Sequence, residues 1–165
     1  MAAVRCAATR DSSPMARQRL PRKRRCVKIP DMMERATVYL EKAQESVAGA
    51  QSELANARYN NAANRAYYAC FQAAIHALNE AGIQPPRATD KWGHGFVQAR
   101  FNGDLIGRRK RYPAELRVIL EHTFRLRQTA DYHRRDHVTE VQAARAARQA
   151  ETFVAAVTRA GGRQR

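Results

Sequence analysis

Apolar residues recur at helical spacing along most of this chain. Over about residues 32–57 they alternate steps of four and three, with Glu, Lys and Gln between them. The stripe consists of Ala36, Leu40, Ala43, Val47, Ala50, Leu54 and Ala57. This pattern predicts one long amphipathic helix.

A second stripe, mostly of small residues, predicts a helix over about residues 61–81. Its members are Ala62, Ala66, Tyr67, Ala69, Cys70, Ala73, Ala74, Ala77 and Leu78. Asn60 and Asn61 are candidate N-caps, and Gly82 is a candidate C-cap. Small side chains on such a stripe allow neighbouring helices to approach closely. Pro85 and Pro86 then enforce a linker.

Three further helices follow the linker. Trp92, Phe96, Val97 and Phe101 predict a short helix that ends near Asn102 and Gly103. Longer helices are predicted over about residues 112–132 and 137–160. Pro113 suits the first turn of the former. Asp136 or Thr139 is expected to cap the latter, which Gly161 and Gly162 end.

These elements predict an all-α fold, an antiparallel bundle of four long helices and one short helix. No alternating strand pattern or internal repeat is present. We expect the bundle to occupy residues 31–160, between a disordered extension over 1–30 and a disordered tail over 161–165. With 165 residues, 44% of them hydrophobic, the chain is long enough for one domain with a real core.

The net charge of +15 directs attention to polyanionic partners. Residues 1–30 carry nine basic residues against one acidic residue. A basic surface attracts nucleic acid first and an anionic membrane second. No apolar run approaches the roughly 20 residues that cross a bilayer, so we expect a soluble protein and no membrane partner. Cys6, Cys26 and Cys70 show no metal-binding spacing, which favours a reducing, cytoplasmic location.

The basic extension over residues 1–30 contains three prolines and no apolar period. Three interpretations compete for it: an arm that binds nucleic acid, an organelle transit peptide, or a segment upstream of the true translation start. Met32 and Met33 stand directly before the first amphipathic helix, as the third interpretation requires.

A chain that begins at Met32 is expected to keep the melting temperature and dimer content of the full chain, because truncation removes no periodic apolar residue. Its non-specific binding to nucleic acid should weaken and depend less on salt, since up to nine cationic contacts are lost. Thermal unfolding and binding at several salt concentrations measure these effects. A Tm lower by several degrees would show instead that the extension packs on the domain.

The segment from Arg125 to His133 is the most informative stretch for chemistry. It carries two arginines, a carboxylate, a phenol and an imidazole within nine residues. The preceding apolar positions place Arg127 and Asp131 close to the buried face of one helix. An arginine near a core needs a partner, and Asp131 is one turn away. The simplest interpretation is a structural ion pair between these residues.

Several short motifs occur in one order along the chain. Residues 59–71 read YNNAANRAYYACF, Lys91 to His94 read KWGH, Phe101 follows, and Arg127 precedes an Asp131-Tyr132 pair. Over about residues 34–158 this order resembles the HEPN domain, the helical domain named for higher eukaryotes and prokaryotes nucleotide-binding.

The resemblance implies a compact bundle that commonly dimerises through the faces that carry these motifs. Many HEPN proteins are metal-independent ribonucleases of toxin–antitoxin, CRISPR and phage-defence systems. They are often encoded beside a small nucleotidyltransferase that acts as antitoxin. The implied partners are therefore a second copy, RNA or a nucleotide, and a nucleotidyltransferase, with no cofactor or metal.

The ribonuclease signature of the family is an arginine followed by a histidine, with four to six residues between them. Arg127 and His133 satisfy it with five. A neutral imidazole can take the proton from an RNA 2′-hydroxyl, while a guanidinium holds the phosphate. The resemblance thus assigns catalysis to Arg127 and His133.

One departure keeps a second hypothesis open. In the branch with both motifs the acidic-Tyr pair is the recurrent feature, whereas a following histidine is not dependable. Six helical positions turn about 240°, so His133 faces away from Arg127 unless the helix ends or kinks there. The alternative is a non-catalytic adaptor that binds a nucleotide or a nucleotidyltransferase and needs only Arg127, Asp131 and Tyr132.

Other polar residues complete the predicted binding pocket, and each has a simpler structural interpretation. The set is Asn64, Arg65, Tyr68, His94, Arg125, Asp131 and Tyr132. Tyr67 and Tyr68 also suit the amphipathic edge of a core, and His94 suits packing at a helix start. The basic run over 108–111 suits a phosphate backbone or simple solvation. His133 and His137 lack the surroundings of a zinc motif.

Overall fold

The computed structural model describes residues 29–85, 91–132 and 137–162, with side chains from residue 37 onward. The helices of these ranges are α1 (Ile29–Ala55), α2 (Tyr59–Glu80), α3 (His94–Arg100), the π-helical segment η1 (Phe101–Arg108), α4 (Glu115–Tyr132) and α5 (Glu140–Gly162). No strand occurs in the described ranges. The predicted all-α bundle of four long helices and a short one is therefore confirmed. Most of the predicted basic extension lies outside the described residues.

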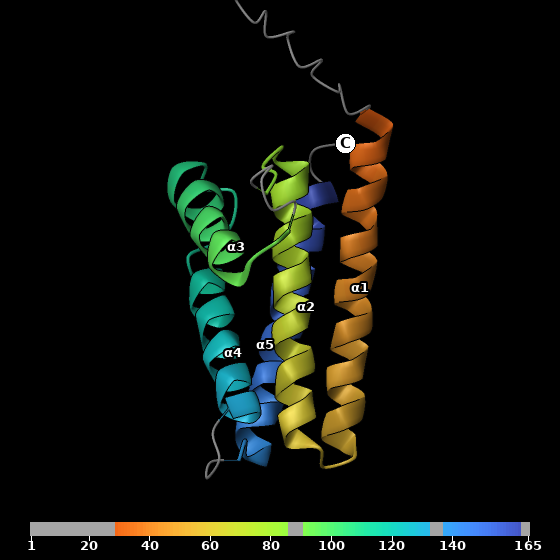
Figure 1. Ribbon diagram of the computed structural model, residues 1–165, viewed down its shortest axis with the longest axis vertical. Coiled ribbons are helices and arrows are strands. Elements are labelled where there is room, and N and C mark those ends of the chain that lie inside the picture. The colour runs from red at the N-terminus through yellow and green to blue at the C-terminus, as the bar shows by residue number, and fades with distance from the viewer. Residues whose placement is uncertain (1–28, 86–90, 133–136, 163–165) are drawn as a thin grey trace, which may run out of the picture.

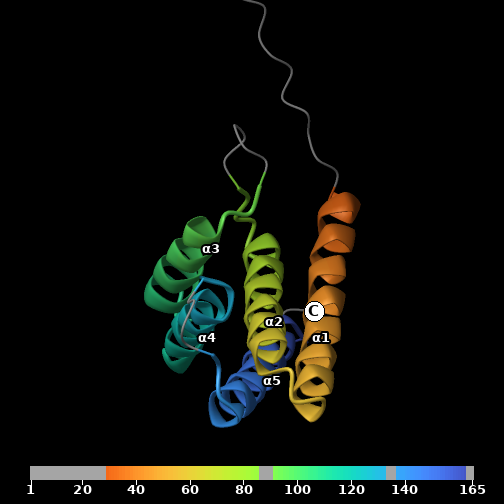
Figure 2. The same cartoon turned by 60° about the horizontal axis from the view of Figure 1, so that its bottom comes forward.

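Helix α2 is the centre of the bundle (Figures 1 and 2). It packs against α1 on one side, α4 on the other and α5 behind, while α3 lies against α2 beyond the end of α4. The predicted stripe of small residues explains this position, because alanines along α2 are fully buried and let three helices approach. Cys70 and Tyr67 are also completely buried on α2.

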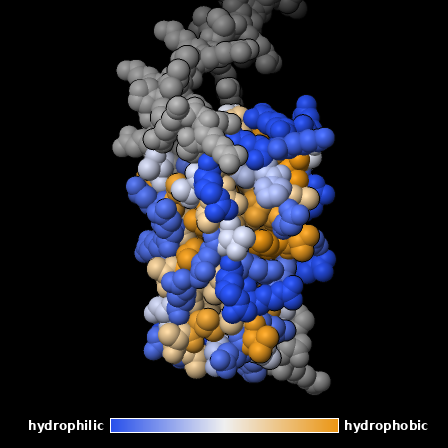
Figure 3. Space-filling model, turned by 180° about the vertical axis from the view of Figure 1, so that it is seen from behind, coloured by the Kyte–Doolittle hydropathy of each residue, from blue (hydrophilic) through white to orange (hydrophobic). Residues whose placement is uncertain are grey.

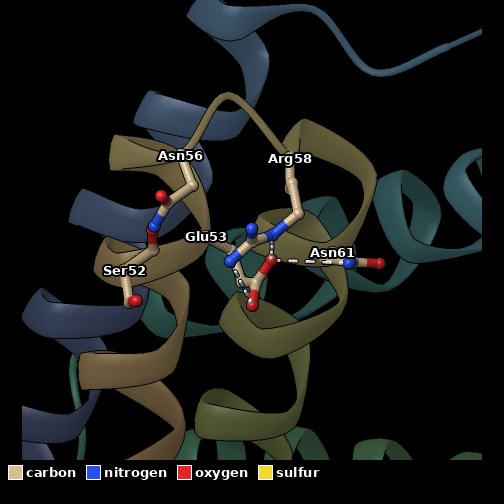
Figure 4. A network of polar contacts seen from close by, with 5 residues as sticks. All are labelled: Ser52, Glu53, Asn56, Arg58 and Asn61. Carbon is tan, nitrogen blue, oxygen red and sulfur yellow. Dashed lines mark hydrogen bonds and ion pairs between the residues drawn. The ribbon is translucent and has the colours of Figure 1, made fainter.

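The turn between α1 and α2 corrects the predicted N-caps. Helix α2 starts at Tyr59, behind an Arg58 that makes no side-chain capping bond. Asn60 Oδ1 instead accepts the Val138 N–H at 3.0 Å, so Asn60 joins the start of α2 to the segment before α5. Asn61 bonds Glu53, whose carboxylate also binds Arg58 (Figure 4). The turn is thus fixed by contacts with Glu53 of α1 and with Val138 before α5. Rules for local capping do not anticipate such contacts.

The predicted end of α2 at Gly82 is confirmed. Gly82 has a φ of 74°, a backbone conformation that residues other than glycine adopt only with strain. Its N–H donates to the Asn79 carbonyl at 3.0 Å, and the Ile83 N–H donates to the Leu78 carbonyl at 2.9 Å. This pair of bonds is a Schellman motif.

The predicted end of the short helix near Asn102 and Gly103 is wrong. The chain continues from α3 through η1 to Arg108, in the wider π-helical form. Leu105 and Ile106 are buried beyond Gly103, so packing against the core holds the segment helical. Asp104 accepts hydrogen bonds from Arg100 at 3.2 Å and from Arg108 at 3.1 Å, which brace η1 on its outer side.

Helix α5 begins with a capping box. The Gln142 N–H donates to Thr139 Oγ1 at 3.3 Å, and the Thr139 N–H donates to Gln142 Oε1 at 2.9 Å. Of the two predicted caps, Thr139 is thus confirmed, whereas Asp136 lies outside the described residues. Gly161 and Gly162 form the last turn of the helix rather than lying beyond it.

One face of the bundle is mostly hydrophilic, and hydrophobic residues form scattered patches on it (Figure 3). None of the helices within the described ranges is long and apolar enough to cross a membrane.

Candidate functional site

The last two turns of α4 carry the predicted ion pair. Leu116, Leu120 and Thr123 bury one face of α4, and Arg127 continues that face by one turn. Arg127 Nε lies 2.8 Å from Asp131 Oδ2, and the two side chains are 16% and 25% exposed. The predicted pairing is confirmed, although the Nε–H direction is poorly aligned for a hydrogen bond. The negative charge of Asp131 thus holds the guanidinium at the edge of the core.

Asn64 of α2 joins this pair from the neighbouring helix. Its Nδ2 donates to Asp131 Oδ1 at 2.7 Å, while its own Oδ1 is buried without a hydrogen-bond partner among the described residues. The Asp131 carboxylate therefore bridges α2 and α4 through its two oxygens. The amide oxygen of Asn64 is thus a buried acceptor that no described residue satisfies.

Two tyrosines flank the guanidinium. Arg127 Cζ lies 5.4 Å from the centroid of the Tyr132 ring, within cation–π range, and Tyr132 is 69% exposed. Burial opposes the charge of Arg127, but Asp131, Tyr132 and Tyr68 outweigh it and raise its pKa above the usual value. Arg127 is a permanent cation beside an exposed aromatic ring, an arrangement suited to a phosphate attached to a base.

His94, at the start of α3, reaches the same region from the third side. Its Nδ1 lies 2.6 Å from the Tyr67 hydroxyl, and its ring is 4.7 Å from the Phe71 ring, centroid to centroid. Burial, followed by the charge of Arg127, lowers the pKa of His94, so the imidazole is neutral near pH 7. No sequence pattern predicts the bond to Tyr67, because α2 and α3 meet only in the fold.

We refer to Asn64, Tyr68, His94, Arg127, Asp131 and Tyr132 as the α2–α4 polar cluster. Its residues come from α2, from the start of α3 and from the last turns of α4. All six belong to the predicted catalytic and binding set.

The structure does not bring Arg65 and Arg125 into this cluster. Arg65 packs beside Gly49 of α1, where its charge acts on Glu53. Arg125 is exposed and pairs with Glu121 one turn earlier on α4. Both positions follow from helical periodicity. Arg65 is one residue from Asn64 and Arg125 is two residues from Arg127, so each points about 100° or more away from its cluster neighbour.

His133, the predicted catalytic partner of Arg127, lies outside the described residues. His137 is described and exposed, and it lines a surface cleft of about 280 Å³ with Arg58, Asn61 and four neighbours. No group of three His, Cys, Asp or Glu side chains capable of holding a metal occurs in the described parts of the chain.

The basic run over 108–111 is largely tied to the bundle. Arg108 pairs with Asp104, and Arg109 donates to the Ala81 carbonyl at 3.1 Å. Arg111 lies 3.3 Å from Glu80, with only 12% of its side chain exposed. These contacts favour a structural role for most of the run over a free loop that follows a phosphate backbone.

Comparison with known families decides the classification. A model of the HEPN domain family matches residues 36–160 of the chain, which is most of its length. The chain belongs to the HEPN domain family. No curated protein matches it. The HEPN match covers every residue of the α2–α4 polar cluster, and its bounds agree closely with the predicted range of 34–158.

Proposed function

We propose that this HEPN protein is a metal-independent endoribonuclease of a toxin–antitoxin or defence system. The observation that carries the proposal is the partly exposed Arg127 guanidinium, held by Asp131 and stacked beside the exposed ring of Tyr132. A fixed cation next to an aromatic face can hold an RNA phosphate while the adjacent base stacks. The excess of basic residues favours the same class of ligand.

The proposed reaction is an internal transfer at one RNA phosphate. The imidazole of His133 takes the 2′-hydroxyl proton, the O2′–P bond forms and the P–O5′ bond breaks. The imidazolium then returns the proton to the departing 5′-oxygen. Arg127 stabilises the charge that develops on the phosphate oxygens. The products are a 2′,3′-cyclic phosphate and a 5′-hydroxyl, so atoms and electrons balance without a metal.

One contact favours a second candidate, the non-catalytic adaptor. Arg127 faces Asp131, which also binds Asn64, so the charge of the guanidinium is already partly neutralised within the chain. Such a cluster could bind a nucleotide or a nucleotidyltransferase partner without cleaving RNA.

Expression of the full chain in a bacterial host separates the two candidates. The ribonuclease proposal predicts growth inhibition with loss of intact cellular RNA. It also predicts relief of that inhibition by a co-expressed nucleotidyltransferase antitoxin. Normal growth with intact RNA, together with nucleotide binding by the purified protein, would favour the adaptor.

We also expect a homodimer at micromolar concentration. The motif-bearing faces of α2 and α4 present Tyr68 and the largely exposed Tyr132, more aromatic surface than a small monomer needs. HEPN domains commonly dimerise through these faces. Light scattering at concentrations well above micromolar measures the mass, and a monomer there would remove any site shared between two copies.

A further inference from the structure

The Tyr67 hydroxyl determines which nitrogen of His94 carries the proton. Tyr67 is completely buried, and burial raises the pKa of its phenol, so the O–H remains a hydrogen-bond donor. A buried donor needs an acceptor. Among the described residues, the acceptor within hydrogen-bond distance is His94 Nδ1 at 2.6 Å. Tyr67 therefore donates to Nδ1, which must be unprotonated.

The charge of Arg127 reinforces this assignment. Protonation of Nδ1 would leave the Tyr67 proton without an acceptor, and Arg127 further opposes a second positive charge.

With Nδ1 as the acceptor, a neutral His94 carries its proton on Nε2. Nε2 has no partner among the described residues, and the His94 side chain is partly exposed. The ring that carries it lies between Phe71 of α2 and Phe124 of α4, and Phe124 is one turn before Arg127.

We propose that His94 is a ligand-binding residue, a fixed neutral N–H donor that contacts a phosphate oxygen beside Arg127. This inference rests on the proposed function only in taking a phosphate ester as the ligand. It assigns His94 the role of donor rather than general base, since the lone pair of its ring is occupied by Tyr67. Arg127 then supplies charge, and His94 supplies a directed hydrogen bond without adding charge.

The tautomer can be tested on the full chain without any activity. Long-range ¹H–¹⁵N NMR correlation at pH 7 distinguishes the two ring nitrogens. We expect His94 to show a protonated Nε2 and an unprotonated Nδ1. Replacing Tyr67 with Phe should abolish this preference, because the phenol proton that selects Nδ1 is removed. A proton on Nδ1, or a charged His94 at pH 7, would overturn the proposal.

Ligand contact is tested with inorganic phosphate and with a single-stranded DNA oligonucleotide, which lacks the 2′-hydroxyl and cannot be cleaved. Both should shift the His94 Nε2 resonance. H94F keeps the ring packing but removes the donor, and should weaken oligonucleotide binding at least about tenfold. H94Q offers an acceptor to Tyr67 and an N–H to phosphate, and should stay within about threefold of wild type.

The outcomes separate this proposal from the ribonuclease proposal. Phosphate binding through His94 in a protein that cleaves no RNA would uphold the former and contradict the latter. Equal oligonucleotide affinity for H94F and wild type, or an unshifted Nε2 at saturating oligonucleotide, would overturn the assignment of His94 even if RNA is cleaved. Should H94F fail to fold, the wild-type NMR measurements alone decide.

Discussion

R127A is expected to lower the free energy of unfolding by about 1 to 3 kcal/mol, whatever the function of the protein. The substitution removes the cation that faces Asp131 and leaves that carboxylate, only 25% exposed, with Asn64 as its remaining described partner. It also loosens the link between α2 and α4 on the inner side of the bundle. Urea denaturation monitored by circular dichroism measures the change.

Two further variants test whether the loss of stability comes from the ion pair with Asp131. R125A removes an exposed arginine of the same helix that pairs only with Glu121, so its cost should be about 0.5 kcal/mol or less. R127A combined with D131N should recover part of the loss, because a neutral amide needs no cation. If R127A were as stable as wild type, the ion pair would have no structural role.

The helices were predictable because their signals are local and periodic. The stripe from Ala62 to Leu78 predicted the length of α2 and the close approach of its neighbours. Gly82 and Thr139 were identified as caps because each motif spans only a few residues. In contrast, Leu105 and Ile106 keep the chain helical beyond Gly103 through contacts with the core, which a turn signal cannot reveal.

The same distinction separates the predicted and unpredicted parts of the site. Arg127 and Asp131 lie four residues apart on one helix, so spacing alone brought them together. Asn64 and His94 were placed in the pocket by the motifs they share with the HEPN family, and the fold brings both to the cluster. The bond between Tyr67 and His94 spans 27 residues and two helices, and no sequence pattern marks it.

Loss of RNA cleavage in H133A is the largest effect that we expect. His133 is the proposed proton acceptor, and in the sequence it directly follows Tyr132 and falls outside the predicted apolar stripe. Its replacement with alanine should therefore change the free energy of unfolding by about 0.5 kcal/mol or less. Loss of the proton acceptor should lower the cleavage rate by a factor of at least about 100. A small change in the free energy of unfolding together with a large loss of cleavage rate is what a catalytic residue is expected to show.

H137A is the matched control. His137 is an exposed histidine four residues later, and it lines the cleft beside Arg58 rather than the α2–α4 polar cluster. Its replacement should leave both the stability and the cleavage rate unchanged. Equal losses of cleavage in H133A and H137A would point to a general effect of charge near the helix end.

The most direct test of the central claim is cleavage of a single-stranded RNA in EDTA by wild-type protein, H133A and H137A. The proposed function predicts that wild type and H137A produce fragments ending in 2′,3′-cyclic phosphate, while H133A produces none above background. Absence of cleavage by wild type, or cleavage by H133A at the wild-type rate, would contradict the catalytic assignment and leave the adaptor hypothesis in its place.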